Sequence, residues 1–352
     1  MHKIVPHNRL TFGDAECDAV LRVVRSGQWA QGPRVEELEN TLAQMAGVKH
    51  AVCVASGLAA LRLSLGALKV RTGDSVLVPA YSCVALANSA MACGAAPVPV
   101  DIEGAFWTLD PKSCVQLASA STRAAIAVNT FGAPADVEGI SVPIIEDCAH
   151  AFGITVAGKN FGSRSTVGVL SFYATKLIGG GEGGAVLTNS SEIASFVKGS
   201  RDYGDQPADA HRMNDKMNEL EAALVLSQLK RLPEMITARA EIAERYVDRL
   251  ADAEKNHIFR LPARSTERIW YRFAVEMLCV PAEKVVRDLL SLGIHAAIPV
   301  TDWRPAGSPA ARNADRAYRS LVSLPLYPTL TQEEQDAVVN AFLKLCEGYA
   351  RA

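Results

Sequence analysis

The feature that most constrains the fold is an alternation of short apolar strands and helices in the first half of the chain. The segment from His50 to Gly57 predicts a short apolar strand that ends on small residues, and a helical run from Leu58 to Leu68 follows it. Further strands are predicted at residues 75–79, 96–102, 124–129, 142–145, 168–173 and 184–188. Because these strands are apolar on both faces, they favour a mainly parallel sheet with helices on both sides.

A change of pattern marks the last third of the chain. Helices are predicted from Asn218 to Lys230 and from Ile236 to Leu250, and the exit from the first unit lies between them. A predicted strand, Trp270–Met277, and two helices, Ala282–Leu292 and Gln332–Tyr349, follow. The 352 residues are therefore divided into a large α/β domain over residues 1–235 and a smaller α+β C-terminal domain over residues 236–352.

The composition excludes several classes of function. A formal charge of −2, without a basic stripe, predicts no nucleic-acid partner. No apolar run approaches the roughly 18 residues that span a bilayer, so we expect no membrane segment and a cytoplasmic location. The eight cysteines and seven histidines show no CxxC or HExxH spacing, which predicts neither a disulfide framework nor a metal site.

Two charged residues lie where the predicted sheet would open onto a ligand. Asp147 follows an apolar strand, and the carboxyl end of such a strand faces the ligand crevice of an open α/β sheet. A carboxylate there would keep a pyridine nitrogen protonated, although capping of the next turn explains Asp147 equally well. Lys176 follows another strand and precedes the glycine-rich run Gly179–Gly184. Because no Gly-Lys-Ser/Thr follows these glycines, a nucleotide-phosphate loop is disfavoured.

An anion-binding turn is the third element of the pattern. Gly57, Leu58 and Ala59 open a predicted helix, where backbone amides favour a phosphate, and the Ser171 hydroxyl could contact the same group. A lysine amine, an acid and a phosphate cup are the groups that an enzyme dependent on pyridoxal phosphate (PLP) requires. Each feature alone has an ordinary structural explanation, so their combination and order carry the prediction.

In combination and order, these segments resemble the DegT/DnrJ/EryC1/StrS family of PLP-dependent aminotransferases, often called sugar aminotransferases. The similarity runs along nearly the whole chain. It includes residues 32–39, 55–61, 73–79, 94–101, 145–150, 171–176, 182–184 and 323–328. The resemblance implies the aspartate-aminotransferase-like fold (fold type I), PLP as the cofactor, and a homodimer whose active sites lie at the subunit interface.

The resemblance also assigns roles by motif position. Lys176 matches the lysine that binds PLP as a Schiff base, and Asp147 matches the partner of the pyridine nitrogen. Ser171 matches a phosphate ligand, and Asn214 matches the asparagine that the neighbouring subunit lends to the phosphate. Lys176 and Asp147 are therefore the expected catalytic residues.

Several positions depart from the common pattern of the family. Leu58 replaces a threonine, so the amides of Leu58 and Ala59 are expected to contribute more to phosphate binding. Cys83 stands where an aromatic residue usually stacks on the cofactor, which leaves Tyr81 as a possible substitute. His150 replaces a glutamine and could touch the ring or its phenolic oxygen. Lys216 replaces an arginine, and the segment around residues 298–303 is short, which affects the substrate side.

The function expected from this resemblance is ping-pong transamination. The amino group would pass from an amino acid, by family habit glutamate, to a ketone or aldehyde, most often a keto-sugar nucleotide. A PLP-dependent dehydratase or aromatic-amine synthase of the same family is an alternative, although the sugar dehydratases replace the lysine with histidine and Lys176 is intact. A non-catalytic PLP-binding regulatory protein is a second alternative. Residues that border the acceptor site in relatives, or merely pack, are Trp29, Gln31, Tyr81, Trp303 and Arg304.

Overall fold

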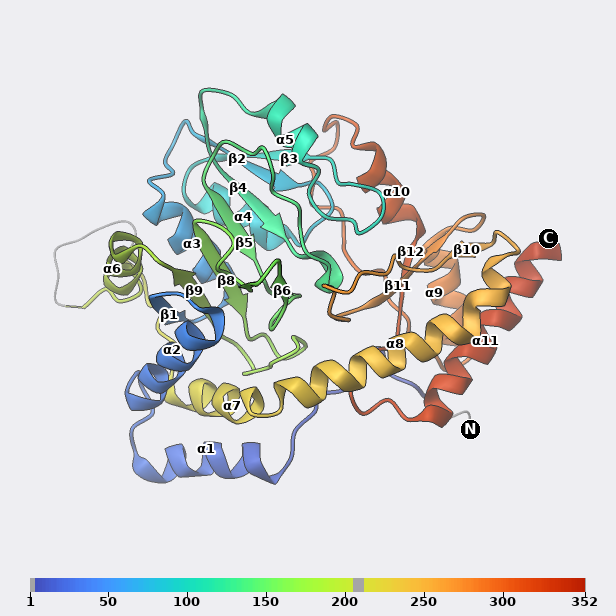
Figure 1. Ribbon diagram of the computed structural model, residues 1–352, viewed down its shortest axis with the longest axis horizontal. Coiled ribbons are helices and arrows are strands. Elements are labelled where there is room, and N and C mark those ends of the chain that lie inside the picture. The colour runs from blue at the N-terminus through green and yellow to red at the C-terminus, as the bar shows by residue number, and fades with distance from the viewer. Residues whose placement is uncertain (1–3, 205–211, 352) are drawn as a thin grey trace.

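A seven-stranded sheet forms the centre of the computed structural model, which describes residues 4–204 and 212–351 (Figure 1). Its strands, in spatial order, are β1 (His50–Val54), β9 (Gly184–Thr188), β8 (Val167–Ser171), β5 (Ile144–Asp147), β4 (Thr122–Val128), β2 (Ser75–Pro79) and β3 (Ala96–Val100). β9 runs antiparallel to its neighbours β1 and β8, and the other pairs are parallel. The predicted α/β fold with a mainly parallel sheet is confirmed.

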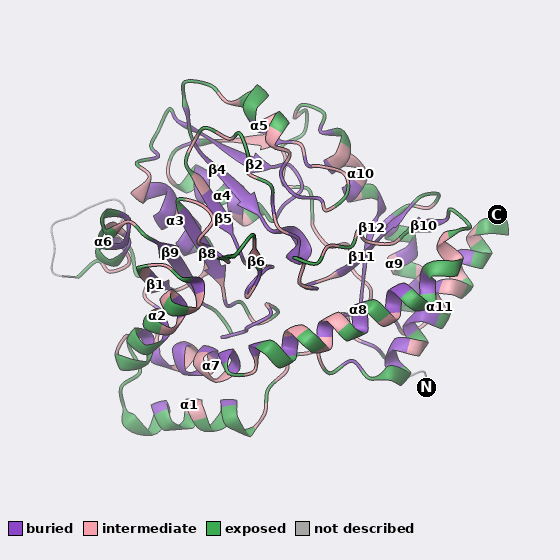
Figure 2. Cartoon of the chain, viewed as in Figure 1, coloured by how far each residue is buried: buried purple, intermediate pink, exposed green. Residues whose placement is uncertain are grey.

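Helices cover both faces of this sheet. In β1, Cys53 faces a core shared with α2 (Pro33–Ala46) and α7 (Glu219–Leu229), whereas Val52 faces a core shared with α3 (Gly57–Ala67), α4 (Val84–Ala92) and α6 (Ser191–Ser200). Alternate residues of a strand point to opposite faces, which is why the inner strands are largely apolar and appear buried in Figure 2, whereas the edge strand β3 is only partly buried. The remaining elements of this part are α1 (Asp14–Ser26), α5 (Pro111–Leu117), β6 (Thr155–Val156) and β7 (Lys159–Asn160).

A smaller unit is built on an antiparallel sheet of β10 (Phe259–Arg260), β11 (Phe273–Met277) and β12 (Leu321–Leu324). Its helices are α9 (Ala282–Ser291), α10 (Arg312–Ser320) and α11 (Gln332–Arg351). The long helix α8 (Leu232–Glu254) links it to the large sheet, because Leu232 and Met235 belong to the core of the large unit, and Tyr246 belongs to that of the small one (Figure 1). The predicted boundary at residues 235 and 236 falls inside α8, so the division stays a prediction.

A backbone contact joins the small unit to the turn that follows β4. The amides of Ile269 and Tyr271 donate to the carbonyls of Gly132 and Phe131, at 3.0 and 3.3 Å. For this reason the predicted strand Trp270–Met277 begins only at Phe273. Gly132 has a φ of +90°, and a Cβ built on it would lie 1.9 Å from the Ile269 carbonyl oxygen, so a glycine is required here.

Two further observations concern only residues 4–204 and 212–351. No helix in these ranges is both long and apolar enough to cross a bilayer. The same ranges contain no cluster of three or more side chains suited to hold a metal ion.

Candidate active site

A cavity of about 540 Å³ lies at the carboxyl ends of four parallel strands. Residues that follow β2, β4, β5 and β8 form one side of this cavity. Tyr271, Arg272 and the segment from Pro299 to Trp303, all from the small unit, form the other side. The side chains that matter most for chemistry are Cys83, Thr130, Asp147, His150, Lys176 and Tyr271. This volume is within the usual range of about 300–1,000 Å³ for sites of small molecules and cofactors.

Asp147 supplies the acid of the cavity. It is the last residue of β5, it is only 5% exposed, and its Oδ1 accepts a hydrogen bond of 2.9 Å from the Ala149 amide. Burial raises the pKa of Asp147, although the Ala149 amide and the Lys176 ammonium act in the opposite direction. The carboxyl group therefore caps its turn and also faces the cavity. A protonated ring nitrogen beside it would offset the cost of burying the carboxylate.

Lys176 is carried by the loop that follows β8. Its Nζ lies 5.4 Å from the centre of the Tyr271 ring, and its amide donates to the Tyr173 carbonyl at 2.8 Å. The glycine-rich segment fixes the loop, since the Gly179 amide donates to Gln228 Oε1 at 2.9 Å and the Gly180 amide to the Phe172 carbonyl at 2.7 Å. The lysine is therefore held at the cavity by backbone contacts.

His150 and Tyr271 form an aromatic wall beside the lysine. Their rings stack with centroids 4.3 Å apart at an interplanar angle of 13°. Burial, followed by the charges of Lys176 and Arg272, lowers the pKa of His150 well below its usual value, so its imidazole is neutral at pH 7. Its buried Nδ1 has no hydrogen-bond partner in the part of the chain that the structure describes. This nitrogen is available to a polar atom of a ligand.

Tyr271 is itself perturbed by its neighbours. Burial opposes ionisation of its hydroxyl, but the charges of Lys176, Arg272 and Arg239 outweigh burial and lower the pKa of Tyr271. Nothing in the sequence singles out Tyr271 as a site residue, because it lies in a stretch that predicts a strand of the small unit. The position of Tyr271 depends on the backbone contact of its segment with Phe131 and Gly132, and no local sequence pattern predicts that contact.

The predicted phosphate cup lies at the start of α3. Ser56 caps this helix, and its Oγ accepts from the Ala59 amide at 3.1 Å. Ser171 ends β8 and packs on Gly57, where an added Cβ would lie 2.9 Å from the Ser171 Cβ. The helix N-terminus and the serine hydroxyl are thus neighbours, and Leu58 is 42% exposed beside them. Because the Ala59 amide already donates to Ser56, an anion would have to compete with the cap for it.

Cys83 and Tyr81 lie in the wall that follows β2. Cys83 is exposed and directly precedes α4. Tyr81 lines the cavity but is only 1% exposed, and it packs edge-on against Tyr318 at 4.8 Å and Phe131 at 6.3 Å between ring centroids. Tyr81 is therefore anchored in the wall by its own packing.

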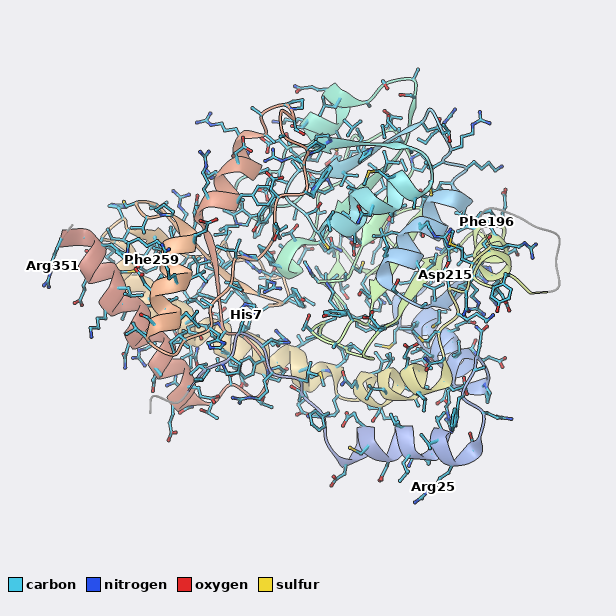
Figure 3. All side chains as sticks on the ribbon, turned by 180° about the vertical axis from the view of Figure 1, so that it is seen from behind. His7, Arg25, Phe196, Asp215, Phe259 and Arg351 are labelled. Carbon is cyan, nitrogen blue, oxygen red and sulfur yellow. The ribbon has the colours of Figure 1, made fainter. Side chains whose placement is uncertain are left out.

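Asn214 lies apart from these groups in the single chain. It is exposed and does not line the cavity that contains Lys176. The next residue is tied to the large unit, because the Asp215 amide donates to the Arg201 carbonyl at 2.9 Å and its carbonyl accepts from Ala55 at 2.7 Å. The Asp215 side chain, labelled in Figure 3, also pairs with Arg62 of α3. The position of Asn214 is therefore fixed at the surface.

Of the residues predicted to border the acceptor site, some line the cavity and others do not. Trp303 lines the cavity, and its Nε1 donates to the Pro79 carbonyl at 3.1 Å. Arg304 forms ion pairs with Asp302 at 2.7 Å and Asp315 at 2.6 Å, so its charge is largely neutralised. Trp29 and Gln31 do not line the cavity of the single chain.

Known proteins share both the sequence pattern and the fold. The profile of the DegT/DnrJ/EryC1/StrS aminotransferase family matches residues 11–343. The aminotransferase TlmJ from Streptoalloteichus hindustanus is 27% identical and superposes with a TM-score of 0.93, over 98% of this chain and 99% of TlmJ.

Two further solved structures agree. PseC from Helicobacter pylori, an aminotransferase involved in the biosynthesis of pseudoaminic acid, is 26% identical, with a TM-score of 0.90 over 98% of this chain and 100% of PseC. NtdA from Bacillus subtilis, solved with the bound cofactor PMP, is 25% identical, with a TM-score of 0.90 over 99% of this chain and 86% of NtdA. The chain belongs to the DegT/DnrJ/EryC1/StrS aminotransferase family and is a PLP-dependent aminotransferase of fold type I.

Proposed function

We propose that this aminotransferase moves an amino group from glutamate to a ketone or aldehyde carbon of a sugar nucleotide, with Lys176 and Asp147 as its catalytic residues. The observation that carries the proposal is the meeting of a lysine and a buried acid in one cavity of about 540 Å³. The same cavity contains His150, whose Nδ1 has no hydrogen-bond partner among the described residues and fits a polar atom of PLP. The helix N-terminus beside Ser171 fits a phosphate, although these residues do not line the cavity of the single chain.

Each of these groups has a proposed part in holding the cofactor. Asp147 would face the pyridine nitrogen, and His150 and Cys83 would border the ring. Ser171 and the start of α3 at Gly57, Leu58 and Ala59 would receive the phosphate, because helix N-termini attract anions. When it is bound, PLP supplies an electron sink for the charge left on the substrate carbon after a proton is removed.

Lys176 is the proposed proton carrier. Its Nζ, as a free amine, would take the proton from the donor Cα and return one in the second half of the reaction. The stacked rings of His150 and Tyr271 cover one side of this amine and limit the access of water. The proposed acid and base therefore come from the ends of the neighbouring strands β5 and β8, and the small unit contributes Tyr271 to the aromatic wall.

The choice of a sugar acceptor has two supports. PseC, an aminotransferase involved in the biosynthesis of pseudoaminic acid, is similar over the whole chain. The wall formed by Pro299 to Trp303 belongs to a loop, which can shape an acceptor site without altering the sheet. Because Arg304 is paired with two aspartates, we expect other cations to bind the acceptor's phosphates.

We also propose that the protein works as a homodimer in which Asn214 of one subunit contacts the phosphate bound by the other. Figure 2 shows that α1 is exposed along much of its length. Large apolar side chains are among the exposed residues of this helix and of the segments beside it. They are Leu10, Phe12, Leu21, Val24 and Trp29, and Phe12 is 68% exposed. Several exposed apolar side chains around one helix are typical of a surface that another protein covers.

The decisive variant is Lys176→Ala, with Lys159→Ala as the matched control because Lys159 is exposed on β7, away from the cavity. We expect purified wild type and the control to become yellow with PLP and to lose that absorbance when glutamate is added. Lys176→Ala should show neither change. A Lys176→Ala protein with the wild-type spectrum would refute the role of Lys176, and a wild type that ignores glutamate would refute the donor.

A further inference from the structure

A second cavity, of about 70 Å³, adjoins the main one. The two cavities share Thr175, Tyr271 and Arg272. The rest of the polar lining comes from the N-terminal segment, from α8 and from β12, with His7, Asn8, Arg239 and Ser323. His7, labelled in Figure 3, lies beside the small unit, where its Nε2 is 2.9 Å from the Ser323 Oγ of β12. The polar side chains that line this small cavity are either cationic or neutral, and none of the described lining residues is a carboxylate.

Two arginines of this cavity have unusual surroundings. Arg239 is only 5% exposed, and its Nη1 donates to the carbonyls of Tyr271 and Leu326, at 3.1 and 3.0 Å. The Nη1 of Arg272 lies 3.2 Å from His7 Nε2. The Nε of each arginine is buried without a partner, and neither forms an ion pair with any residue that the structure describes. A buried guanidinium without a counter-ion is costly, so this arrangement calls for an anion.

The electrostatics agree with an anion site. Burial, together with the charge of Arg272, lowers the pKa of Arg239 to about 10. Burial and the same two arginines lower the pKa of His7 to about 4, so His7 is neutral at pH 7. The cavity thus has two positive charges and a neutral histidine. Its volume of about 70 Å³ is roughly that of two water molecules in the liquid, which suits a carboxylate group.

We propose that Arg272, supported by Arg239, binds a carboxylate of the amino-acid donor. The inference rests on the proposed function, and it names the part of the donor that the protein recognises. Lys176 Nζ and Arg272 Cζ each lie 5.4 Å from the centre of the Tyr271 ring, so the two cations flank one side chain. Lys176 and Arg272 also line the same main cavity, so the inference places the donor's amine at Lys176 and one of its carboxylates at Arg272. A guanidinium fork matches the two oxygens of a carboxylate, which would select amino acids over simple amines.

The first test measures binding without turnover. Glutarate, a dicarboxylate without an amine, is titrated calorimetrically into the PLP-loaded protein. We expect Arg272→Met to weaken glutarate binding by about 10- to 100-fold, the usual effect of losing a hydrogen-bonded charge. The control is Arg249→Met, because Arg249 is exposed and pairs with Asp336 far from the cavity. Unchanged glutarate affinity in Arg272→Met, or binding of inorganic phosphate in place of glutarate, would overturn the inference.

A second test identifies which carboxylate is bound. Glutamate is compared with 2-aminobutanoate, which lacks its distal carboxylate, and with 4-aminobutanoate, which lacks its α-carboxylate. The rate of loss of the cofactor absorbance is followed in a single turnover. If the α-carboxylate binds, Arg272→Met slows 2-aminobutanoate but not 4-aminobutanoate, and if the distal one binds, the reverse holds. Equal rates of wild type and variant with both compounds would contradict the proposal.

Two outcomes separate this inference from the proposed function. A wild type that binds glutarate through Arg272 but reacts with no amino acid would refute transamination and leave the carboxylate site intact. A wild type that reacts with glutamate as fast as Arg272→Met does would refute the site alone. Should Arg272→Met fail to fold, Arg272→Lys retains the charge without the fork, and we expect about a tenfold loss of glutarate affinity.

Discussion

The contact between Gly132 and Ile269 decides whether the small unit reaches the active site. Gly132 has a φ of +90°, and a Cβ there would lie 1.9 Å from a backbone oxygen, which cannot rotate away as a side chain could. The replacement Gly132→Ala must therefore separate the turn after β4 from the segment that carries Tyr271. The cavity would lose its aromatic wall and Arg272 together.

The size of the effect can be worked out from two parts. A non-glycine residue with a positive φ costs about 1–2 kcal/mol. Separating the segments breaks the hydrogen bonds of the Ile269 and Tyr271 amides, each of which contributes about 0.5–1.5 kcal/mol. We therefore expect Gly132→Ala to lower the free energy of unfolding by about 2–5 kcal/mol. Gly139→Ala is the matched control, because Gly139 has a φ of +78° but no atom within 4 Å of the added Cβ.

The assay is urea unfolding followed by circular dichroism, combined with a titration of PLP by absorbance. Gly139→Ala should show only the backbone strain of about 1–2 kcal/mol and should bind PLP and react with glutamate normally. Gly132→Ala should lose more stability than the control and react more slowly with glutamate. Equal losses of stability in the two variants, with normal reactivity in both, would refute the role of this contact.

Two further predictions concern the acid and the exposed patch. Because burial raises the pKa of Asp147, this group stabilises the cofactor-free protein below its ordinary pKa of 3.8, and that contribution is lost as pH rises through the raised pKa. At pH 7, Asp147→Asn should therefore unfold at a higher urea concentration than wild type, while its turnover rate should fall by about 100-fold. The control Asp136→Asn, at an exposed residue, should change neither the urea midpoint nor the turnover rate. Phe12→Asp should convert the proposed dimer to monomers, as measured by light scattering, and should weaken PLP binding because Asn214 of the partner subunit would be lost. Val115→Asp, at an exposed apolar residue of α5, should keep the wild-type mass and PLP affinity.

Much of the large unit could be predicted because its strands are buried on both faces and give continuous apolar runs. The same reasoning located several cavity residues. Asp147 and His150 lie at the end of β5, Lys176 follows β8 and Cys83 follows β2. The carboxyl ends of parallel strands meet at one edge, so residues far apart in sequence had to come together there. The position of these residues at one edge of the sheet could therefore be predicted from local patterns, whereas the cofactor was predicted from their combination and from the family resemblance.

The start of α8 was predicted incorrectly, and the reason is local. Pro233 suggested a break, with the helix resuming at Ile236, whereas α8 begins at Leu232. Proline is compatible with the first turn of a helix, where its missing amide would have no partner in any case. The continuous helix matters because Arg239 is one of its residues and is buried between the two units.

Tyr271, Arg239 and Arg272 could not be predicted, because their positions depend on how the small unit lies against the sheet. No periodicity in the sequence encodes the contact between Gly132 and Ile269 that brings them to Lys176. The groups proposed for catalysis and those proposed for donor binding also come from different parts of the chain. The sheet supplies the acid and the lysine, and the small unit and α8 supply the unpaired cations. A change of donor should therefore need substitutions only around Arg272, and the groups proposed to bind the cofactor could stay as they are.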